Sequence, residues 1–315
     1  MAIQLPEGLP ARRQLASEGV AVVGAAQRGP GRRRAAQRKL RVGLLNLMPG
    51  KAVTETQIAR LLGAAPQLVE LSLLVPGSYR PKSADPEHLE TFYRPWPSVR
   101  DRRFDGLIVT GAPVETLPFE AVDYWQELTA VFDWAEQAVG GSFFICWAAQ
   151  AALYHWHGVP KHDLPEKAFG VFPHRLRATG VTLMQGLPNR FPVPVSRRSE
   201  TRAEDLPRSG VVQVLIESPE SGLCLLQEPA RRAVYMFNHL EYDADTLPGE
   251  YRRDLAAGLP ILPPRNVFPQ DDPARPPLNA WRPYGLRLFR NWLDSLAAQA
   301  EGDTRPRLAR TAAAE

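Results

Sequence analysis

Cys146 is the residue of this sequence best placed to act as a nucleophile. It follows an apolar run, Phe143 to Ile145, that predicts a buried strand, and it precedes an alanine-rich segment that predicts a helix. A cysteine at such a turn lies at the positive end of the helix dipole, beside N–H groups that have no helical partner. These groups favour the thiolate and can stabilise an oxyanion once the sulfur attacks a carbonyl. The alternative is an inert core cysteine, because free cysteines are often buried.

A histidine and a carboxylate much later in the chain favour the first interpretation. The apolar run Tyr235 to Phe237 is followed by His239 and, two positions further on, by Glu241. An activated thiol requires a base and a group that orients this base. We therefore expect Cys146, His239 and Glu241 to form a catalytic triad.

The segments around Cys146 predict a sheet that can position it. Apolar runs at 40–47, 68–75 and 104–110 predict strands, and apolar residues at helical spacing predict helices at 86–92 and 119–138. A further helix is expected to begin near Thr54, where Thr54 to Gln57 has the capping-box spacing. This alternation predicts an α/β fold, a doubly wound and mostly parallel sheet with helices on both faces.

Functional residues in such sheets collect at the carboxyl ends of the strands. Residues 47–49, 111–113, Cys146 and 238–239 each follow a predicted strand, so we expect one site there. The short apolar runs at 211–216, 222–226 and 233–237 predict antiparallel hairpins added to this sheet. Helices at 246–257 and 281–298 would close the chain.

The charge distribution separates the N-terminus from the rest. Residues 1–41 carry nine Lys and Arg against two acidic residues, whereas the whole chain has a net charge of +4, which leaves −3 for the remainder. We expect 1–39 to be a flexible basic extension rather than a nucleic-acid-binding patch, 40–300 to be a single domain, and 301–315 to be a disordered tail.

The remaining composition points to a cytoplasmic protein without a membrane partner. Two cysteines, Cys146 and Cys224, argue against a disulfide framework, and no apolar run approaches the ~18 residues of a membrane span. Cys224 lies in an apolar strand and is expected to be structural. His155, His157 and His162 lack the spacing and companions of a metal site, so no metal is expected. Two further histidines, His88 and His174, are expected on the surface or in loops.

Taken together, these residues resemble the homoserine O-acyltransferase family, in the cysteine-nucleophile branch with a flavodoxin-like, class I glutamine amidotransferase-like fold. The resemblance runs from about Leu40 to Leu296. It is carried by Leu45 to Pro49, Lys51, Thr54 and Glu55, Asp105 to Pro113, Cys146 to Gln150, His239 to Asp243 and Asn291 to Leu293.

The resemblance implies a ping-pong acyl transfer to L-homoserine in methionine biosynthesis. Cys146 would carry the acyl group, His239 would deprotonate the acceptor hydroxyl, and Glu241 would orient His239. No cofactor is implied; acetyl-CoA or succinyl-CoA is the co-substrate. By motif position, Lys167 and Arg253 would bind the amino acid, Arg253 through a bidentate contact to its carboxylate, and Ser196 would affect substrate choice. Lys51 and Trp147 are further candidates.

Glu115 occupies the family position that separates acetyl from succinyl donors, and a glutamate there implies acetyl-CoA. A succinyl carboxylate ~4 Å from Glu115 would be repelled by about 4 kcal/mol at an effective dielectric constant of about 20. Half of that energy would still give roughly thirtyfold discrimination. Asn238 and Leu240 differ from the frequent Gly-His-Pro-Glu pattern of the family, and Gly50 and Val195 also differ from its frequent residues. Because these positions are expected around the amino-acid pocket, serine is an alternative acceptor to homoserine.

Two hypotheses from other classes stay open at this point. A glutamine amidotransferase-like hydrolase has the same cysteine, histidine and glutamate layout, but it normally needs an ammonia-accepting domain or partner. A non-catalytic binding protein on the same fold predicts that Cys146→Ala leaves function intact. The sequence implies small-molecule substrates, acyl-CoA and homoserine, and leaves a homodimer as one option for the assembly.

Overall fold

The computed structural model describes residues 2–24, 39–79, 85–272 and 274–302. Their centre is a mixed sheet whose strand order is β2-β1-β4-β3-β6-β7-β12-β11-β10-β8-β9, with β5 paired to β4. The strands from β2 to β12 in this order run parallel to their neighbours, and those from β12 to β9 are antiparallel. The fold is therefore the expected α/β architecture with added antiparallel hairpins.

The bounds of the elements are as follows. The parallel strands are β1 (Ala2–Gln4), β2 (Ala21–Val23), β3 (Leu40–Leu45), β4 (Leu68–Val75), β5 (Tyr93–Pro95), β6 (Gly106–Val109), β7 (Ser142–Ile145) and β12 (Ala233–Met236). The others are β8 (His162–Leu176), β9 (Arg190–Glu200), β10 (Gln213–Ser218) and β11 (Gly222–Glu228). The helices are α1 (Ala11–Ser17), α2 (Lys51–Gly63), α3 (Pro86–Phe92), α4 (Trp125–Ala138), α5 (Trp147–His157), α6 (Thr246–Ala256) and α7 (Arg282–Gly302), with short 3-10 turns between them.

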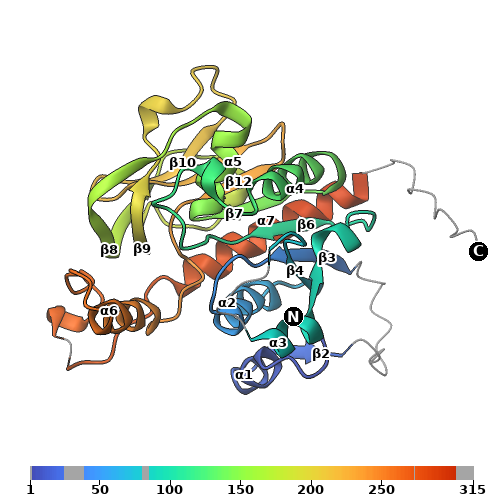
Figure 1. Ribbon diagram of the computed structural model, residues 1–315, viewed down its shortest axis with the longest axis horizontal. Helices are drawn as coiled ribbons and strands as arrows, with labels where there is room; N and C mark the ends of the chain where they lie inside the picture. Colours follow the sequence, from blue (N-terminus) through green and yellow to red (C-terminus); the bar gives the residue numbers. More distant parts are fainter. Residues whose placement is uncertain (1, 25–38, 80–84, 273, 303–315) are drawn as a thin grey trace, which may run out of the picture.

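Helices cover both faces of the sheet, α4 and α5 on one side and α2 and α7 on the other (Figure 1). The strands alternate between the two cores, because successive side chains of a strand point to opposite faces. In β7, Phe143 and Ile145 enter the core under α2 and α7, whereas Phe144 enters the core under α4 and α5. None of the helices in the described ranges combines the length and apolarity needed to cross a membrane.

The expectation of a flexible N-terminal arm is wrong for residues 2–24. β1 pairs in parallel with both β4 and β2, and α1 connects β1 to β2. Ile3 and Leu15 are fully buried, so this segment contributes to the core under α2. Residues 25–38, where most of the basic charge lies, are outside the described residues. At the other end, α7 includes Glu301, and the rest of the expected tail from residue 303 is also outside them.

Two helix boundaries also differ from expectation. The capping-box prediction at Thr54 is wrong: α2 begins at Lys51, and Thr54 lies one turn inside it, where its hydroxyl donates to the carbonyl of Gly50 at 3.4 Å. The helix expected from residue 119 is split, because the extended backbone of Val122 separates a 3-10 turn, Phe119–Ala121, from α4.

Candidate active site

Cys146 lies at the turn between β7 and α5, where sequence analysis placed it. Its backbone has φ 56° and ψ −122°, an unfavourable conformation for a residue with a side chain. The N–H of Cys146 donates to the carbonyl of Met236 at 2.6 Å, which holds the turn against β12. A strained turn of this kind exposes the sulfur above the sheet and at the N-terminus of α5.

Gly111 leaves the space that the sulfur needs. It follows β6, whose register with β7 brings it beside Cys146. A Cβ atom at this position would lie 2.9 Å from Cβ and 3.5 Å from Sγ of Cys146. A side chain at residue 111 would therefore displace the nucleophile.

His239 and Glu241 form the rest of the expected triad. Nδ1 of His239 lies 2.7 Å from Oε1 of Glu241, and His239 and Cys146 line the same cavity. Burial lowers the pKa of His239, but the negative charges of Glu241 and of the Cys146 thiolate outweigh it, so the pKa lies well above its usual value. The raised pKa favours the protonated imidazole of His239.

The register of the sheet explains how these distant residues meet. Met236 at the end of β12 pairs with Ile145 at the end of β7, so the residues that follow both strands emerge at the same edge. The N–H of His239 donates to the carbonyl of Pro194 in β9 at 2.9 Å, which ties the base to the antiparallel part of the sheet.

A network of charged side chains faces the triad. Tyr242 stacks on the imidazole of His239 with ring centroids 4.1 Å apart, and its hydroxyl donates to Oε1 of Glu250 at 2.9 Å. Oε2 of Glu250 accepts from Nζ of Lys167 at 2.9 Å and from the hydroxyl of Ser196. Burial raises the pKa of Glu250, but the charge of Lys167 and the hydrogen bonds from Ser196 and Lys167 outweigh this effect, so the net result is a lowered pKa. Glu250 is thus a buried carboxylate in contact with two predicted substrate-binding residues.

Sequence reasoning missed Glu250. It shares a face of α6 with Arg253 and Asp254, at helical spacings of three and four residues. Arg253 donates to Oδ1 of Asp254 from Nε at 2.8 Å and from Nη2 at 2.6 Å, while 67% of its side chain stays exposed. The spacing of these charges on one helix face was the signal in the sequence that could have pointed to Glu250.

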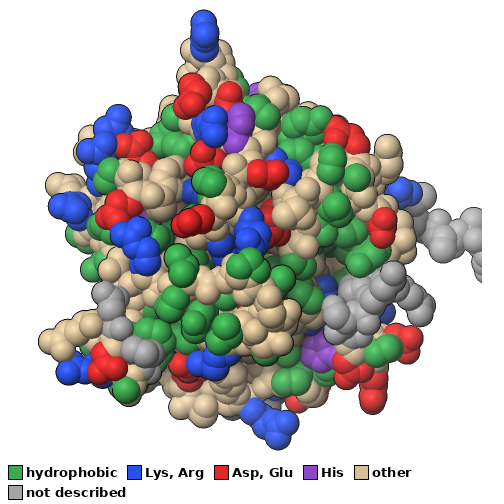
Figure 2. Space-filling view, turned by 60° about the vertical axis from the view of Figure 1, so that its left-hand side comes forward, with side chains coloured by type: hydrophobic (Ala, Val, Ile, Leu, Met, Phe, Trp, Pro, Cys, Tyr) green, Lys and Arg blue, Asp and Glu red, His purple; other side chains and the backbone are tan. Residues whose placement is uncertain are grey.

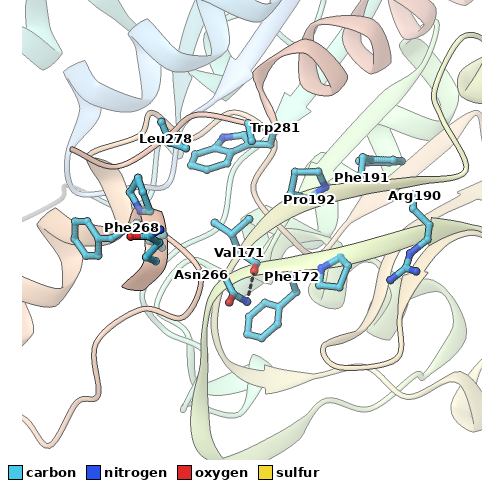
Figure 3. A pocket seen from close by; sticks show the side chains of 14 residues that line it. Val171, Phe172, Arg190, Phe191, Pro192, Asn266, Phe268, Leu278 and Trp281 are labelled. Carbon is cyan, nitrogen blue, oxygen red and sulfur yellow. Dashed lines mark hydrogen bonds between the residues drawn. The ribbon is translucent and has the colours of Figure 1, made fainter. Parts of the chain in front are cut away.

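These residues surround a cavity of about 220 Å³ above the carboxyl ends of β6, β7 and β12. The predicted residues that line it are Cys146, His239, Lys167, Ser196, Arg253, Glu115 and Trp147. Glu115 lies half-buried in the loop after β6, and its carbonyl accepts from Nζ of Lys161 at 2.5 Å. A larger cleft of about 640 Å³ lies between β8, β9 and residues 266–281, and none of the predicted site residues lines it (Figure 3).

The two further candidates differ in position. Trp147 lines the cavity at the start of α5, but its indole is buried against Phe119 and Tyr124. Lys51 does not line the cavity: its ammonium donates to the carbonyl of Asn46 at 2.5 Å inside the protein. Burial lowers the pKa of Lys51 to about 8, against the opposing charge of Glu55. The structure therefore does not bring Lys51 into the site.

The other histidines have carboxylate or buried polar neighbours. His155, His157 and His162 lie 2.7, 2.9 and 2.7 Å from carboxylate oxygens of Asp133, Glu228 and Asp205. Within the described residues, no group of three or more His, Cys, Asp or Glu side chains is arranged to hold a metal ion. The surface or loop position expected for His88 and His174 is wrong: His88 is half-buried on α3, 2.8 Å from Glu55, and His174 is fully buried in β8. Cys224 is buried in β11, as expected, and burial raises the pKa of its thiol to about 12.

Comparison with known proteins identifies the family of this chain. A homoserine O-acetyltransferase of Novosphingobium aromaticivorans is 51% identical over 294 residues, which cover 93% of this chain and 95% of that protein. A homoserine O-acetyltransferase of Synechococcus elongatus is 52% identical, covering 93% of this chain and 97% of that protein.

The fold resembles a glutamine amidotransferase of Thermotoga maritima with a TM-score of 0.52 and 13% identity, over 82% of this chain and 98% of that structure. The family model described as homoserine O-succinyltransferase matches residues 2–302. The chain belongs to the homoserine O-succinyltransferase family.

Proposed function

We propose that this enzyme transfers an acetyl group from acetyl-CoA to the hydroxyl of L-homoserine, through an acetyl-Cys146 intermediate. The observation that carries the proposal is that Cys146 and His239 line the same cavity, with Nδ1 of His239 2.7 Å from Oε1 of Glu241. The proposed reaction needs no bound cofactor beyond the acyl-CoA co-substrate.

In the first half-reaction, the Cys146 thiolate attacks the thioester carbonyl of the donor. The bond from the carbonyl carbon to the CoA sulfur breaks, and the His239 imidazolium gives its proton to the departing CoA thiolate. The N–H groups of Trp147 and Ala148, the first two of α5, precede the first hydrogen bonds of the helix, which Ala149 and Gln150 make to the carbonyl of Cys146, and they are available to stabilise the intermediate oxyanion. The exchange of one thioester for another is close to neutral in free energy.

In the second half-reaction, neutral His239 takes the proton of the homoserine hydroxyl. The oxygen attacks the acetyl-cysteine carbonyl, the product ester leaves, and the thiolate and imidazolium are restored. Glu241 holds Nδ1–H of His239, so that Nε2 is the atom that exchanges the proton. Electrons and protons balance over the cycle without another reactant.

The cavity offers complementary charges for an amino acid. The exposed guanidinium of Arg253 can bind the α-carboxylate with two hydrogen bonds. The carboxylate of Glu250, with Ser196 beside it, supplies negative charge for the α-amino group. Lys167 lies 4.0 Å from the ring centroid of Phe169 and fixes Glu250 in this position.

The names in this family suggest two donors, acetyl-CoA and succinyl-CoA, and Glu115 is the residue that would select between them. The family model is described by succinyl transfer, whereas the similar relatives are named for acetyl transfer. A carboxylate in the cavity wall repels the carboxylate of a succinyl group and leaves an acetyl group unaffected. This favours acetyl-CoA.

The test is CoA release from acetyl-CoA or succinyl-CoA, each with homoserine or serine as acceptor. We expect the fastest release with acetyl-CoA and homoserine, and an acetyl adduct on the Cys146 peptide when the donor is present alone. Cys146→Ala should abolish both, while Cys224→Ala, a substitution of the buried cysteine, should retain them. Glutamine hydrolysis without CoA release would instead favour the amidotransferase-like hypothesis.

A further inference from the structure

A group of buried polar side chains lies behind the catalytic histidine and takes no part in the proposed chemistry. His174 in β8 and Asn238, the residue before His239, are both 0% exposed. Nδ2 of Asn238 lies 2.9 Å from Nε2 of His174, and the hydroxyl of Ser221 lies 3.3 Å from the same nitrogen. Buried polar groups of this kind are costly unless they are hydrogen bonded, which makes their arrangement specific.

The neighbours of His174 determine its protonation. Its Nδ1 lies 2.8 Å from the carbonyl oxygen of Phe172, which can only accept, so Nδ1 carries the hydrogen. Nε2 is then the acceptor for the amide of Asn238. Burial, helped by the charge of Arg197 and opposed by the hydrogen bond to Phe172, lowers the pKa of His174 to about 4, so the imidazole is neutral at neutral pH.

Three consecutive residues at this turn are held by three different strands. The N–H of Phe237 donates to the carbonyl of Cys224 in β11 at 2.8 Å, and the N–H of His239 donates to the carbonyl of Pro194 in β9 at 2.9 Å. Between them, the side chain of Asn238 is held by His174 in β8. The contact with His174 is the one among these three that depends on side chains.

We propose that His174 is a positioning residue for the reaction: its neutral Nε2 accepts the amide of Asn238 and thereby fixes the turn that presents His239 to Cys146. This inference rests on the proposed function, because it takes His239 as the base. The geometry of a base must be held closely, since small displacements of reacting groups cost a large part of the rate. His174 itself touches neither the substrates nor the sulfur.

Two substitutions at residue 174 test the roles of the two ring nitrogens separately. The amide of Gln can place an acceptor oxygen near the position of Nε2, whereas the shorter amide of Asn reaches only the position of Nδ1. His174→Gln therefore keeps an acceptor for Asn238, and His174→Asn keeps only a donor for the carbonyl of Phe172. Both variants remove the ring, so they lose similar packing.

We expect His174→Asn to lower kcat for acetyl transfer about tenfold, equivalent to ~1.4 kcal/mol, with the KM for homoserine unchanged. His174→Gln should stay within about twofold of wild type, and Asn238→Ala should match His174→Asn. The double variant His174→Asn with Asn238→Ala should also lose about tenfold rather than a hundredfold, because both changes break one contact. Thermal unfolding compares these variants with Leu215→Ala, a fully buried position in β10 that should lower Tm without lowering kcat.

Wild-type kcat in His174→Asn would overturn the inference, as would equal losses in His174→Asn and His174→Gln. The rate at which iodoacetamide alkylates Cys146 can be measured without an acyl acceptor. We expect this rate to rank the variants in the same order as kcat does. If wild type transfers no acetyl group, the proposed function fails. The alkylation rates then still decide whether His174 positions His239.

Discussion

The electrostatics of the triad rest on one buried carboxylate. Glu241 is 7% exposed, and only its Oε1 has a hydrogen-bond partner among the described residues, namely His239. The charge of Glu241 is the main cause that raises the pKa of His239, against the effect of burial. The protonated form of His239 therefore depends on Glu241.

Replacing Glu241 by Gln should remove this charge and keep the shape. The pKa of His239 should fall, so the imidazolium should be lost at lower pH than in wild type. We expect kcat/KM for acetyl transfer to fall by about 10⁴, the loss in kcat seen when the orienting carboxylate of a serine-protease triad becomes an amide. The measurement is kcat/KM as a function of pH. The control is Glu217→Gln, which changes an ion pair with Arg175 on the surface, and equal rates for the two variants would contradict the assigned role.

The choice of acyl donor is expected to depend on another single residue, Glu115. Glu115→Gly removes the negative charge from the cavity wall, so the ratio of kcat/KM for succinyl-CoA over acetyl-CoA should rise by about thirtyfold or more. Glu120→Gln removes a charge nearby in the chain from a residue that does not line the cavity, and it should leave the ratio unchanged. A ratio that rises equally in both variants would mean that net charge, rather than contact with the acyl group, selects the donor.

At the scale of elements, the N-terminal segment is connected to the catalytic turn. Arg60 in α2 is 5% exposed and donates to Glu18, which follows α1, from Nε at 2.5 Å and from Nη2 at 2.8 Å. Its Nη1 donates to Asp243 at 2.7 Å, next to the Tyr242 ring that stacks on His239. The segment 2–24 is therefore linked through Arg60 to the turn that carries the site.

Glu18→Gln should destabilise the protein in a pH-dependent way. The hydrogen bond from Arg60 is the main cause that lowers the pKa of Glu18 below its usual 4.5. A lowered pKa adds stability that is complete above the unfolded value and disappears as pH falls through the folded value. We expect a loss of about 1 kcal/mol in the free energy of unfolding at pH 7, which shrinks below pH 4.5. Urea unfolding measures it, with Glu7→Gln, whose ion pair with Arg12 is exposed, as the control.

Sequence patterns predicted the elements with strong periodicity and missed those that depend on distant contacts. Strands β3, β4, β6 and β7 are apolar runs, and Cys146 follows one of them, so the position of the nucleophile could be predicted. β1 and β2 have three residues each, too few for a pattern, and they exist because β4 offers a free edge. The charge spacing on α6 could have pointed to Glu250, but its partners come from β8, β9 and the turn after β12, and the spacing within one helix does not reveal them.

At the scale of the whole molecule, the cavity lies where two kinds of sheet meet. The parallel part supplies Cys146 and the loop with Glu115, while β8, β9 and α6 supply Lys167, Ser196 and Arg253. Basic and acidic side chains are interspersed over the face shown in Figure 2 rather than separated by sign. An amino acid bound in this cavity, as we propose, would connect the two parts of the sheet.

This arrangement predicts that the acceptor alone stabilises the fold. Homoserine at a hundred times its Kd should add about 2.7 kcal/mol to the free energy of unfolding, because a ligand that binds only the folded state shifts the equilibrium by mass action. Cys146→Ala should keep this stabilisation, since the sulfur acts on the acyl group, whereas Arg253→Ala should lose most of it. Arg252→Ala, an exposed neighbour on α6 that does not line the cavity, is the matched control. Thermal unfolding with and without homoserine measures the effect, and equal stabilisation of Arg253→Ala and Arg252→Ala would show that the carboxylate binds elsewhere.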